Sequence, residues 1–473
     1  MGNTVVYSQN QNGDLKLDAE LEASGVFSAG DYAPFWFTNN VNGIASEKRN
    51  KEYLRAKVTG SKGFFDNKLK LNSGADFLVA HNLEADIYIQ QLFFDINYRA
   101  LGLSIGMKER YNPIRNTKLS SGIMSYSNNM RPVPQIEVGI PEFTDFPFTH
   151  GKLQIKGGLS YGKFLDDKFK EKYAGDGNYV KNILFHRKYG YLKLQLKPTW
   201  DLIAGLDMSA QFGGDRYMDG KYVGSNPHGF DDYIKVLFNM SGGSKSDLGD
   251  QINKLGNSFG SWHIVFNYYA EKYHVRIYNE HFFEDNSGLV FRNMPDGLYG
   301  VELNLKKKQL FSSILFEFLY ARNHSGKYTL NEKGQMSPIR AADDYYNNYM
   351  YISASNYGFV VGNPFFVSPI YNGRQNLIVL NNKIVAYHAG VCGYYNNNLS
   401  YRLLLSYTRA YGAARMPETW TFKHQFSTMY EMTYANPNLK DWEFTGALAY
   451  DNSDMVGKNF GGKLSIIKKF SIK

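Results

Sequence analysis

The chain has 473 residues, 16% of them aromatic with 37 Tyr and 33 Phe, and its mean hydropathy is -0.42. No stretch approaches the roughly 18 consecutive apolar residues of a membrane helix, which excludes a helical membrane protein. The composition fits a transmembrane β-barrel, because lipid-facing and lumen-facing residues alternate along each strand and aromatic girdles flank the membrane.

The charge balance gives no support for a nucleic-acid partner. The 53 basic and 44 acidic residues leave a net charge of +9 and an isoelectric point near 9.1. The basic residues are scattered along the chain without a long run of Lys or Arg. An acidic polymer or anionic lipid headgroups therefore stay open as partners.

The first 50 residues are less regular than the rest. The chain begins MGNTVVYSQNQNG, without the charged start and apolar core of an export signal, and we expect that signal to have been removed. The stretch GDYAPFWFTNN places three aromatic residues behind a proline. We expect residues 1–50 to be an N-terminal segment packed at or in the barrel, and residues 51–473 to be the barrel with inserted lumen loops.

Alternation with period two predicts strands along the whole chain. In NKLKLNSGADF, Leu69, Leu71 and Phe77 point one way while Lys70 and Asp76 point the other. The pattern returns in YLKLQLK, VELNLK and FTGALAYD, and GKLSIIKKFSIK reads as a closing strand. One face of each strand is therefore apolar and the other polar.

The connections between the predicted strands differ in length. Short turns such as FFDNK and YNNN alternate with long polar stretches such as DRYMDGKYVGSNPHGFDD and MSGGSKSDLGDQINKLGNSFGS. Outer-membrane barrels show this asymmetry between their periplasmic and outer ends. A soluble β-sandwich also alternates, but it does not need one unbroken series of this length.

Ten stretches between about Gly30 and Asp451 carry a family resemblance. They are GDYAPFWFTNN, YIQQLFFDINY, IGMKERY, LSSGIMSYSNNMRPVPQIEVGIPEFTDFPFTHGKLQIKG, YVKNILFHRKYGYLKL, QFGGD, SGGSKSDLGDQINKLGNSFGS, HFFEDNSGLVFRNMPDGLYG, DDYYNN and LKDWEFTGALAYD. In their order and number they resemble the capsule assembly protein Wzi family, in the form common among Bacteroidota.

The resemblance implies an all-β, transmembrane antiparallel barrel of about 18 strands in the outer membrane, with segments plugging the lumen and long extracellular loops. It implies a lectin-like, non-catalytic role in holding surface polysaccharide, a role that belongs to enterobacterial relatives. Their periplasmic helical bundle looks reduced here, since residues 1–50 leave little room for it. Lipopolysaccharide and other envelope proteins are further candidate partners.

The segment RPVPQIEVGIPEF holds Pro132, Pro134 and Pro141, which belong at a strand edge, a bulge or a loop. Inside a polar lumen its unpaired carbonyls stay solvated, so we predict a stiffened constriction there. Nearby charges are predicted to form a network across the lumen that either binds polysaccharide or holds a plug shut. These residues are Glu109, Arg110, Arg115, Arg131, Glu137 and Glu142.

The stretch DDYYNN combines rings, which cover apolar sugar faces, with acids and amides, which bond to hydroxyls. An ordinary aromatic girdle is the alternative. Glycine-rich stretches add further polar candidates, for which an architectural role is equally open. The candidates are Asp343, Asp344, Tyr345, Tyr346 and Asn347 in the first group and Gln211, Asp250, Gln251, Asn257 and Asp285 in the second.

We expect no enzyme, no metal site and no cofactor. Ser465 and Lys468 form S-x-x-K, but on a strand they point to opposite faces. His274 and His281 are seven apart and diverge in the same way. No nucleotide-binding loop or cysteine cluster is present in the sequence. The rival functions are a diffusion channel and a structural subunit that docks other envelope proteins.

Overall fold

A computed structural model describes residues 15–112, 114–242, 255–284, 286–324, 328–330, 336–338, 343–373 and 377–472. Eighteen antiparallel strands form one sheet, and its last strand pairs with its first. The predicted barrel is therefore confirmed, and a two-sheet sandwich is wrong. Its strands are β1 (Lys16–Gly30), β2 (Lys51–Phe64), β3 (Leu69–His81), β4 (Ile87–Tyr98), β5 (Leu101–Met107), β6 (Gln135–Asp145), β7 (Leu153–Lys163), β9 (Leu184–Lys197), β10 (Trp200–Phe212), β13 (Asn257–Tyr269), β14 (Tyr273–Phe283), β15 (Gly297–Leu305), β16 (Ser313–Ala321), β23 (Ile384–Tyr394), β24 (Leu399–Ala410), β25 (Lys423–Ala435), β26 (Trp442–Ser453) and β27 (Gly457–Ile472).

The remaining elements lie in the connections between wall strands. A small sheet orders β12, β11 and β8, and the other short strands form two-stranded pairs. No helix of the described residues is long and apolar enough to cross a membrane. These elements are α1 (Phe35–Thr38), α2 (Asp167–Ala174), β8 (Tyr179–Lys181), β11 (Asp215–Met218), β12 (Lys221–Ser225), α3 (Phe230–Phe238), α5 (Asn286–Leu289), β17 (Tyr328–Leu330), β18 (Met336–Pro338), β19 (Asn347–Asn348), β20 (Ile352–Ser353), β21 (Ser355–Asn356), β22 (Phe359–Val360), η1 (Pro369–Tyr371), η2 (Pro417–Thr419) and η3 (Pro437–Leu439).

The wall begins at β1, so the boundary expected at residue 50 is wrong. β1 pairs with β2 on one side and with β27 on the other, and these pairings close the barrel. Leu21 and Phe27 of β1 are exposed on the outer face, as in the other strands. Only residues 31–50, here called the inner segment, turn inward. There α1 is buried, and the backbone N–H of Phe35 donates to Asp451 of β26.

The outer face of the wall is apolar and the inner face is polar. Phe77 is 47% exposed while its neighbour Asp76 is fully buried, and Val301 and Glu302 repeat the contrast. A closed sheet satisfies its backbone internally, and so large an exposed apolar surface fits lipid rather than water. The alternation predicted for these strands is confirmed.

An arginine on this outer face should be costly. We expect Leu464→Arg, in the middle of β27, to lower the free energy of unfolding in lipid vesicles by about 2–4 kcal/mol. Leu464 is 67% exposed, so the cost comes from placing the charge in lipid and not from a lost core contact. Urea titration measures the effect. Leu439→Arg, in the turn between β25 and β26, is the matched control and should cost about 0–1 kcal/mol. Equal costs would contradict a lipid-facing β27.

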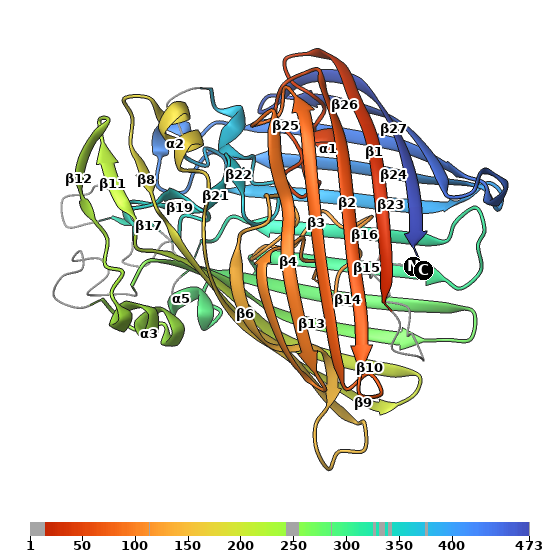
Figure 1. The fold of residues 1–473 in the computed structure, drawn as a ribbon. Coiled ribbons are helices and arrows are strands. Elements are labelled where there is room, and N and C mark those ends of the chain that lie inside the picture. Colours follow the sequence, from red (N-terminus) through yellow and green to blue (C-terminus); the bar gives the residue numbers. More distant parts are fainter. Residues whose placement is uncertain are drawn as a thin grey trace.

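The two ends of the barrel differ as predicted. Short turns such as residues 65–68 and 395–398 lie at the end where β1 starts and β27 finishes. The long connections, including residues 108–134 and 322–383, leave from the other end. Figure 1 shows the end of β27 away from the end of the barrel that carries α2, α3 and β12. The long-loop end is therefore the outer end in a membrane barrel.

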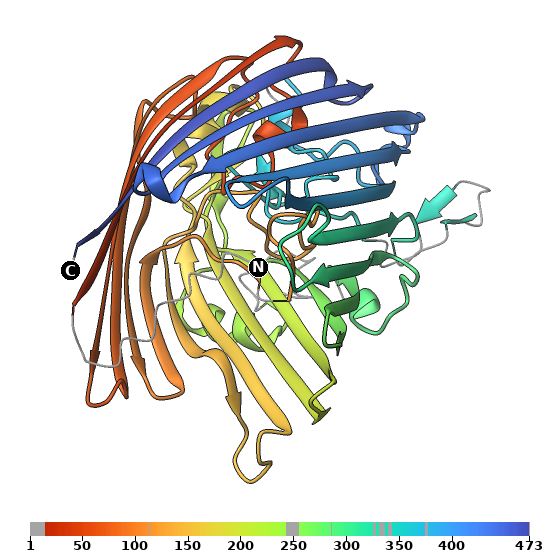
Figure 2. The same cartoon turned by 90° about the vertical axis from the view of Figure 1, so that its right-hand side faces the viewer.

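Segments from three connections fill the bore. They are the inner segment, a strap (residues 108–134, between β5 and β6) and an inner loop (residues 343–373 and 377–383, before β23). In Figure 2 these segments lie inside the ring of strands. Their apolar side chains form one buried cluster with side chains of the wall.

Candidate functional site

The strap crosses the lumen and is held by carboxylates of the opposite wall. Arg115 donates to Glu280 of β14 at 3.2 Å, and the backbone N–H of Met124 donates to the same carboxylate at 2.7 Å. The Arg115 guanidinium also lies 3.8 Å from the ring centre of Tyr278. Both members of the ion pair are buried, so the strap depends on this contact.

Two further wall glutamates hold the strap. Glu317 of β16 accepts from the Ser120 hydroxyl at 2.6 Å and from the Ser121 backbone N–H at 2.7 Å. Glu302 of β15 accepts from the Asn116 amide at 2.6 Å. Five hydrogen bonds to three glutamates, one each on β14, β15 and β16, therefore fix the course of the strap.

The first residues of the strap contact the near wall. Glu109 accepts from Arg55 of β2 at 2.9 Å, and Arg55 also forms a two-point contact with Asp76. Arg110 donates to Glu137 of β6 at 3.2 Å. Bidentate arginine–carboxylate pairs fix geometry as well as charge, so this end of the strap is also anchored.

The charged residues predicted to form a cross-lumen network pair mostly with other residues. Among its six residues only Arg110 and Glu137 pair with each other within the described chain. Glu109 and Arg115 pair instead with wall residues that sequence reasoning missed. The missed partners share one signal, a charged residue on the polar face of a strand: Arg55, Asp76, Glu280, Glu302 and Glu317.

Within the residues that the structure describes, Glu142 forms no ion pair with the charged residues of this network, which corrects its assignment to it. It is exposed on β6, just after Pro141, where the pairing of β6 with β7 breaks between Ile140 and Thr144. Pro141 therefore occupies a strand irregularity, whereas Pro132 and Pro134 lie in the strap. The constriction predicted for all three prolines is wrong for Pro141.

Arg131 differs from Arg110 and Arg115, the other arginines of the predicted network, because it has no carboxylate within ion-pair distance in the described chain. Its guanidinium lies between the rings of Tyr88 and Tyr357, at 4.1 and 4.4 Å from their centres. One nitrogen donates to the Ile89 carbonyl at 3.3 Å. Arg131 also lines a pocket of about 240 Å³ with Asn356, whose Oδ1 has no hydrogen-bond partner in the described chain.

The DDYYNN stretch is part of the interior and is not an exposed sugar platform. Tyr345 and Tyr346 are fully buried, and their hydroxyls donate to Asp296 at 2.8 Å and to the Met124 carbonyl at 2.5 Å. Asn347 exchanges two hydrogen bonds with the backbone of Val379. These side chains bind the inner loop to the strap and to the wall.

The remaining candidates are structural or lie outside the described residues. Gln211 of β10 accepts from the Asn257 amide of β13 at 2.9 Å, and both are buried at neighbouring strand ends. Asp250, Gln251 and Asp285 fall outside the described residues. The described part of the chain holds no group of three or more His, Cys, Asp or Glu that could bind a metal.

Three carboxyl groups meet where the inner loop begins. Glu284 accepts from the backbone N–H groups of Tyr346 at 2.5 Å and Asp344 at 3.2 Å. Burial raises the pKa of Glu284 well above its ordinary value, and the nearby Asp343 and Asp344 raise it further, against the opposing effects of the Tyr346 N–H and of Arg415. The neutral carboxyl is therefore the form that the docked loop favours.

Docking of the inner loop should weaken as pH rises. Because the folded-state pKa of Glu284 is raised, its contribution is complete below the ordinary value of 4.5 and is lost as pH rises through the folded value. We expect faster amide exchange at residues 343–347 at pH 8 than at pH 5, after correction for intrinsic rates. Glu284→Gln keeps an acceptor and should flatten this dependence, while Glu418→Gln, in an exposed loop, should leave it unchanged. An unchanged profile in Glu284→Gln would contradict the assignment.

Comparison with solved structures shows the fold. No protein-family model matches the sequence, and no curated protein matches it. The structure is similar to that of Wzi from Escherichia coli, described as an outer-membrane protein involved in group 1 capsule assembly and a carbohydrate-binding β-barrel. The TM-score is 0.59 at 12% identity, over 96% of this chain and 85% of Wzi.

Two proteins of Pseudomonas aeruginosa are similar at a lower level. OccK5 (OpdH) gives a TM-score of 0.52 at 10% identity, over 98% of this chain and 100% of that protein. OprD gives 0.50 at 10% identity, over 97% and 96%. At these identities the likeness concerns the fold alone, and it identifies the chain as a barrel of the outer-membrane type.

Proposed function

We propose that this protein lies in the outer membrane and binds surface polysaccharide without catalysing a reaction. The observation that carries the proposal is the filled bore. An open diffusion channel has a polar, water-filled lumen. Here the lumen contains a buried apolar cluster built from the inner segment, the strap and the inner loop.

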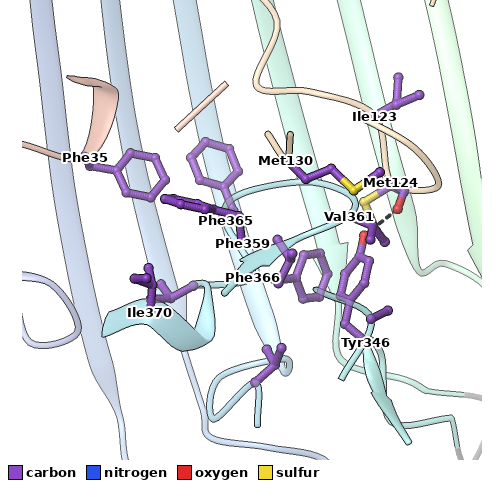
Figure 3. Close-up of a cluster of buried hydrophobic side chains, with 14 of the residues drawn as sticks. Phe35, Ile123, Met124, Met130, Tyr346, Phe359, Val361, Phe365, Phe366 and Ile370 are labelled. Carbon is purple, nitrogen blue, oxygen red and sulfur yellow. Dashed lines mark hydrogen bonds between the residues drawn. The ribbon is translucent and has the colours of Figure 1, made fainter. Parts of the chain in front are cut away.

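The cluster is closely packed where these segments meet. The Tyr346 ring lies 4.8 Å from that of Phe366 and 5.2 Å from that of Phe282, and its hydroxyl reaches the strap at Met124. Figure 3 shows Phe35 of the inner segment beside Phe365 of the inner loop. Such packing excludes water, so it favours a static barrel that binds a polymer over a conduit.

The description of Wzi as a carbohydrate-binding barrel supports a polysaccharide as the ligand. Within this chain the Arg131 pocket offers suitable groups. The Arg131 guanidinium lines the pocket without a carboxylate partner and is oriented by two rings, so it suits a sugar that carries a carboxylate. We therefore place a polysaccharide contact at Arg131.

Cells that lack the gene test this function. We expect them to shed surface polysaccharide that wild-type cells retain, and we expect the purified barrel to bind that polysaccharide. Arg131→Gln should weaken binding, while Arg99→Gln, an exposed arginine over Tyr98 in the turn after β4, should not. Normal retention together with no glycan binding would overturn the proposal.

Single-channel recordings separate the rival functions. A plugged binding protein should be nearly silent, and steady large conductance in the wild-type chain would favour a diffusion channel. Recovery of one stoichiometric partner protein from mild detergent would favour a structural subunit.

A further inference from the structure

Three basic residues gather on the outer face of the wall, at the loop end of β16, β23 and β24. Arg409 lies on the exposed face of β24 and is paired with Val385 of β23. Lys383 directly precedes β23, and Arg322 directly follows β16, which pairs with it. The backbone N–H of Tyr411 donates to the Lys383 carbonyl at 2.9 Å, which brings the strand ends together.

Each of the three cations is placed over an aromatic ring. Arg322 lies 4.0 Å from the ring centre of Tyr411, Lys383 lies 4.4 Å from that of Trp420, and Arg409 lies 5.6 Å from that of Tyr407. Rings held beneath cations keep the side chains oriented without neutralising their charge. The cluster of Arg322, Lys383 and Arg409 is called the basic rim below.

The Asp296 carboxylate accepts from the backbone N–H of Arg322 at 3.0 Å, but the side chains of the basic rim have no acidic partner within the part of the chain that the structure describes. None of its three residues forms an ion pair there, and the nearby Asp454 is paired with His424 at 2.7 Å. Burial lowers the pKa of Lys383, and the neighbouring Arg322 lowers it further. An anion at the rim would relieve this repulsion.

A row of aromatic residues lies directly below the rim on the same face. Tyr299, Phe318, Tyr387 and Tyr407 are paired in register across β15, β16, β23 and β24. The rings of Phe318 and Tyr387 are 5.2 Å apart. Aromatic rows of this kind mark the membrane interface, so the rim lies at the level of the outer-leaflet headgroups.

Below this row the wall is hollowed. A groove of about 400 Å³ is lined mainly by Ile264, Phe266, Ile277, Val301, Phe316 and Phe318, which face the membrane. Asn279 also lines it, in register with Tyr299, and its amide nitrogen has no hydrogen-bond partner in the described chain. This nitrogen is enclosed at the level of the aromatic row, and a turn of the side chain toward the groove would let it donate to an acyl-ester or acyl-amide carbonyl at the interface.

We propose that this face binds a phosphorylated lipid of the outer leaflet, with the phosphate at the basic rim, an acyl carbonyl at Asn279 and an acyl chain in the groove. From the loop end toward the membrane centre, the basic rim, Asn279 and the groove follow one another. Phosphate, acyl carbonyl and acyl chain follow one another in the same order along such a lipid. The groove is apolar and faces hydrocarbon, so neither a free phosphate nor a polysaccharide would fill it. The site is independent of the polysaccharide contact proposed above.

Native mass spectrometry of the full barrel in mild detergent tests the site. The probes are bisphosphorylated lipid A, its dephosphorylated form and inorganic phosphate. We expect the bisphosphorylated lipid to be retained, the dephosphorylated form to be lost and inorganic phosphate not to compete. The variant Arg322→Gln/Lys383→Gln/Arg409→Gln should weaken retention on the order of a hundredfold, since each basic residue near a membrane surface contributes a factor of about five.

A matched variant distinguishes specific binding at the basic rim from a general effect of the positive charge of the barrel. Lys62→Gln/Arg99→Gln/Lys468→Gln removes three cations that also lie over rings, but at the opposite end of the barrel. It should retain the lipid as the wild type does. Equal loss in both triple variants, full retention in the rim variant, or competition by inorganic phosphate would each overturn the proposal.

A second variant tests the level of the acyl carbonyl. Asn279→Leu should weaken retention several-fold while the preference for the phosphorylated lipid remains. An unchanged affinity would overturn the placement of the lipid in the groove. Heat-modifiable mobility on SDS gels shows whether each variant is folded. Polysaccharide binding should be normal in all of the variants.

Discussion

Replacing Arg115 by leucine is expected to lower the free energy of unfolding by about 3–5 kcal/mol. The variant leaves Glu280 as a buried carboxylate without its cation, although the Met124 backbone N–H still donates to it at 2.7 Å. The lost cation cannot be replaced by water without opening the strap. Urea titration in vesicles measures the loss, and amide exchange should quicken at residues 114–130.

Lys118→Leu is the matched control for this prediction. Lys118 lies on the same strap but its side chain is exposed, so we expect a change within about 0.5 kcal/mol. Similar losses in the two variants would show that the strap tolerates no leucine anywhere. An unchanged Arg115→Leu would show that the strap is held without its ion pair.

The wall was predictable from the sequence because its physics is local. Lipid on one side and a polar lumen on the other impose the alternation seen at Asp76 and Phe77, and each strand carries this signal by itself. The exception is β1, which was not predicted as a wall strand. Its inner face holds Glu20 and Glu22 among small residues. Its position was fixed by pairing with β27, at the far end of the sequence.

The contents of the bore were less predictable because they depend on contacts between distant residues. The alternation places Glu280, Glu302 and Glu317 on a polar face, but only the folded course of the strap assigns Arg115 to Glu280. Residues of the kind found in DDYYNN occur both on sugar-binding surfaces and in protein cores, so their composition does not distinguish the two. Partner residues such as Phe282 and Phe366 decide the outcome, and they are distant in sequence.

Tyr346 separates the structural role of DDYYNN from a sugar-binding role. Tyr346→Ala removes a fully buried ring and should cost about 3–5 kcal/mol of unfolding free energy, as for other large-to-small core changes. Tyr346→Phe keeps the ring but leaves the Met124 carbonyl without its donor and the Asn363 backbone N–H without its acceptor, so it should cost about 1–3 kcal/mol.

The order of these two losses, measured by urea titration with glycan binding recorded in parallel, distinguishes the roles. A core ring predicts that alanine is the more damaging change and that any loss of glycan binding follows the loss of stability. A ring that contacts sugar predicts the opposite pattern, in which alanine abolishes binding at wild-type stability. Because the ring is enclosed by Phe282, Phe366 and the strap, a sugar could reach it only after the inner loop had left the bore, and that opening would itself appear as conductance.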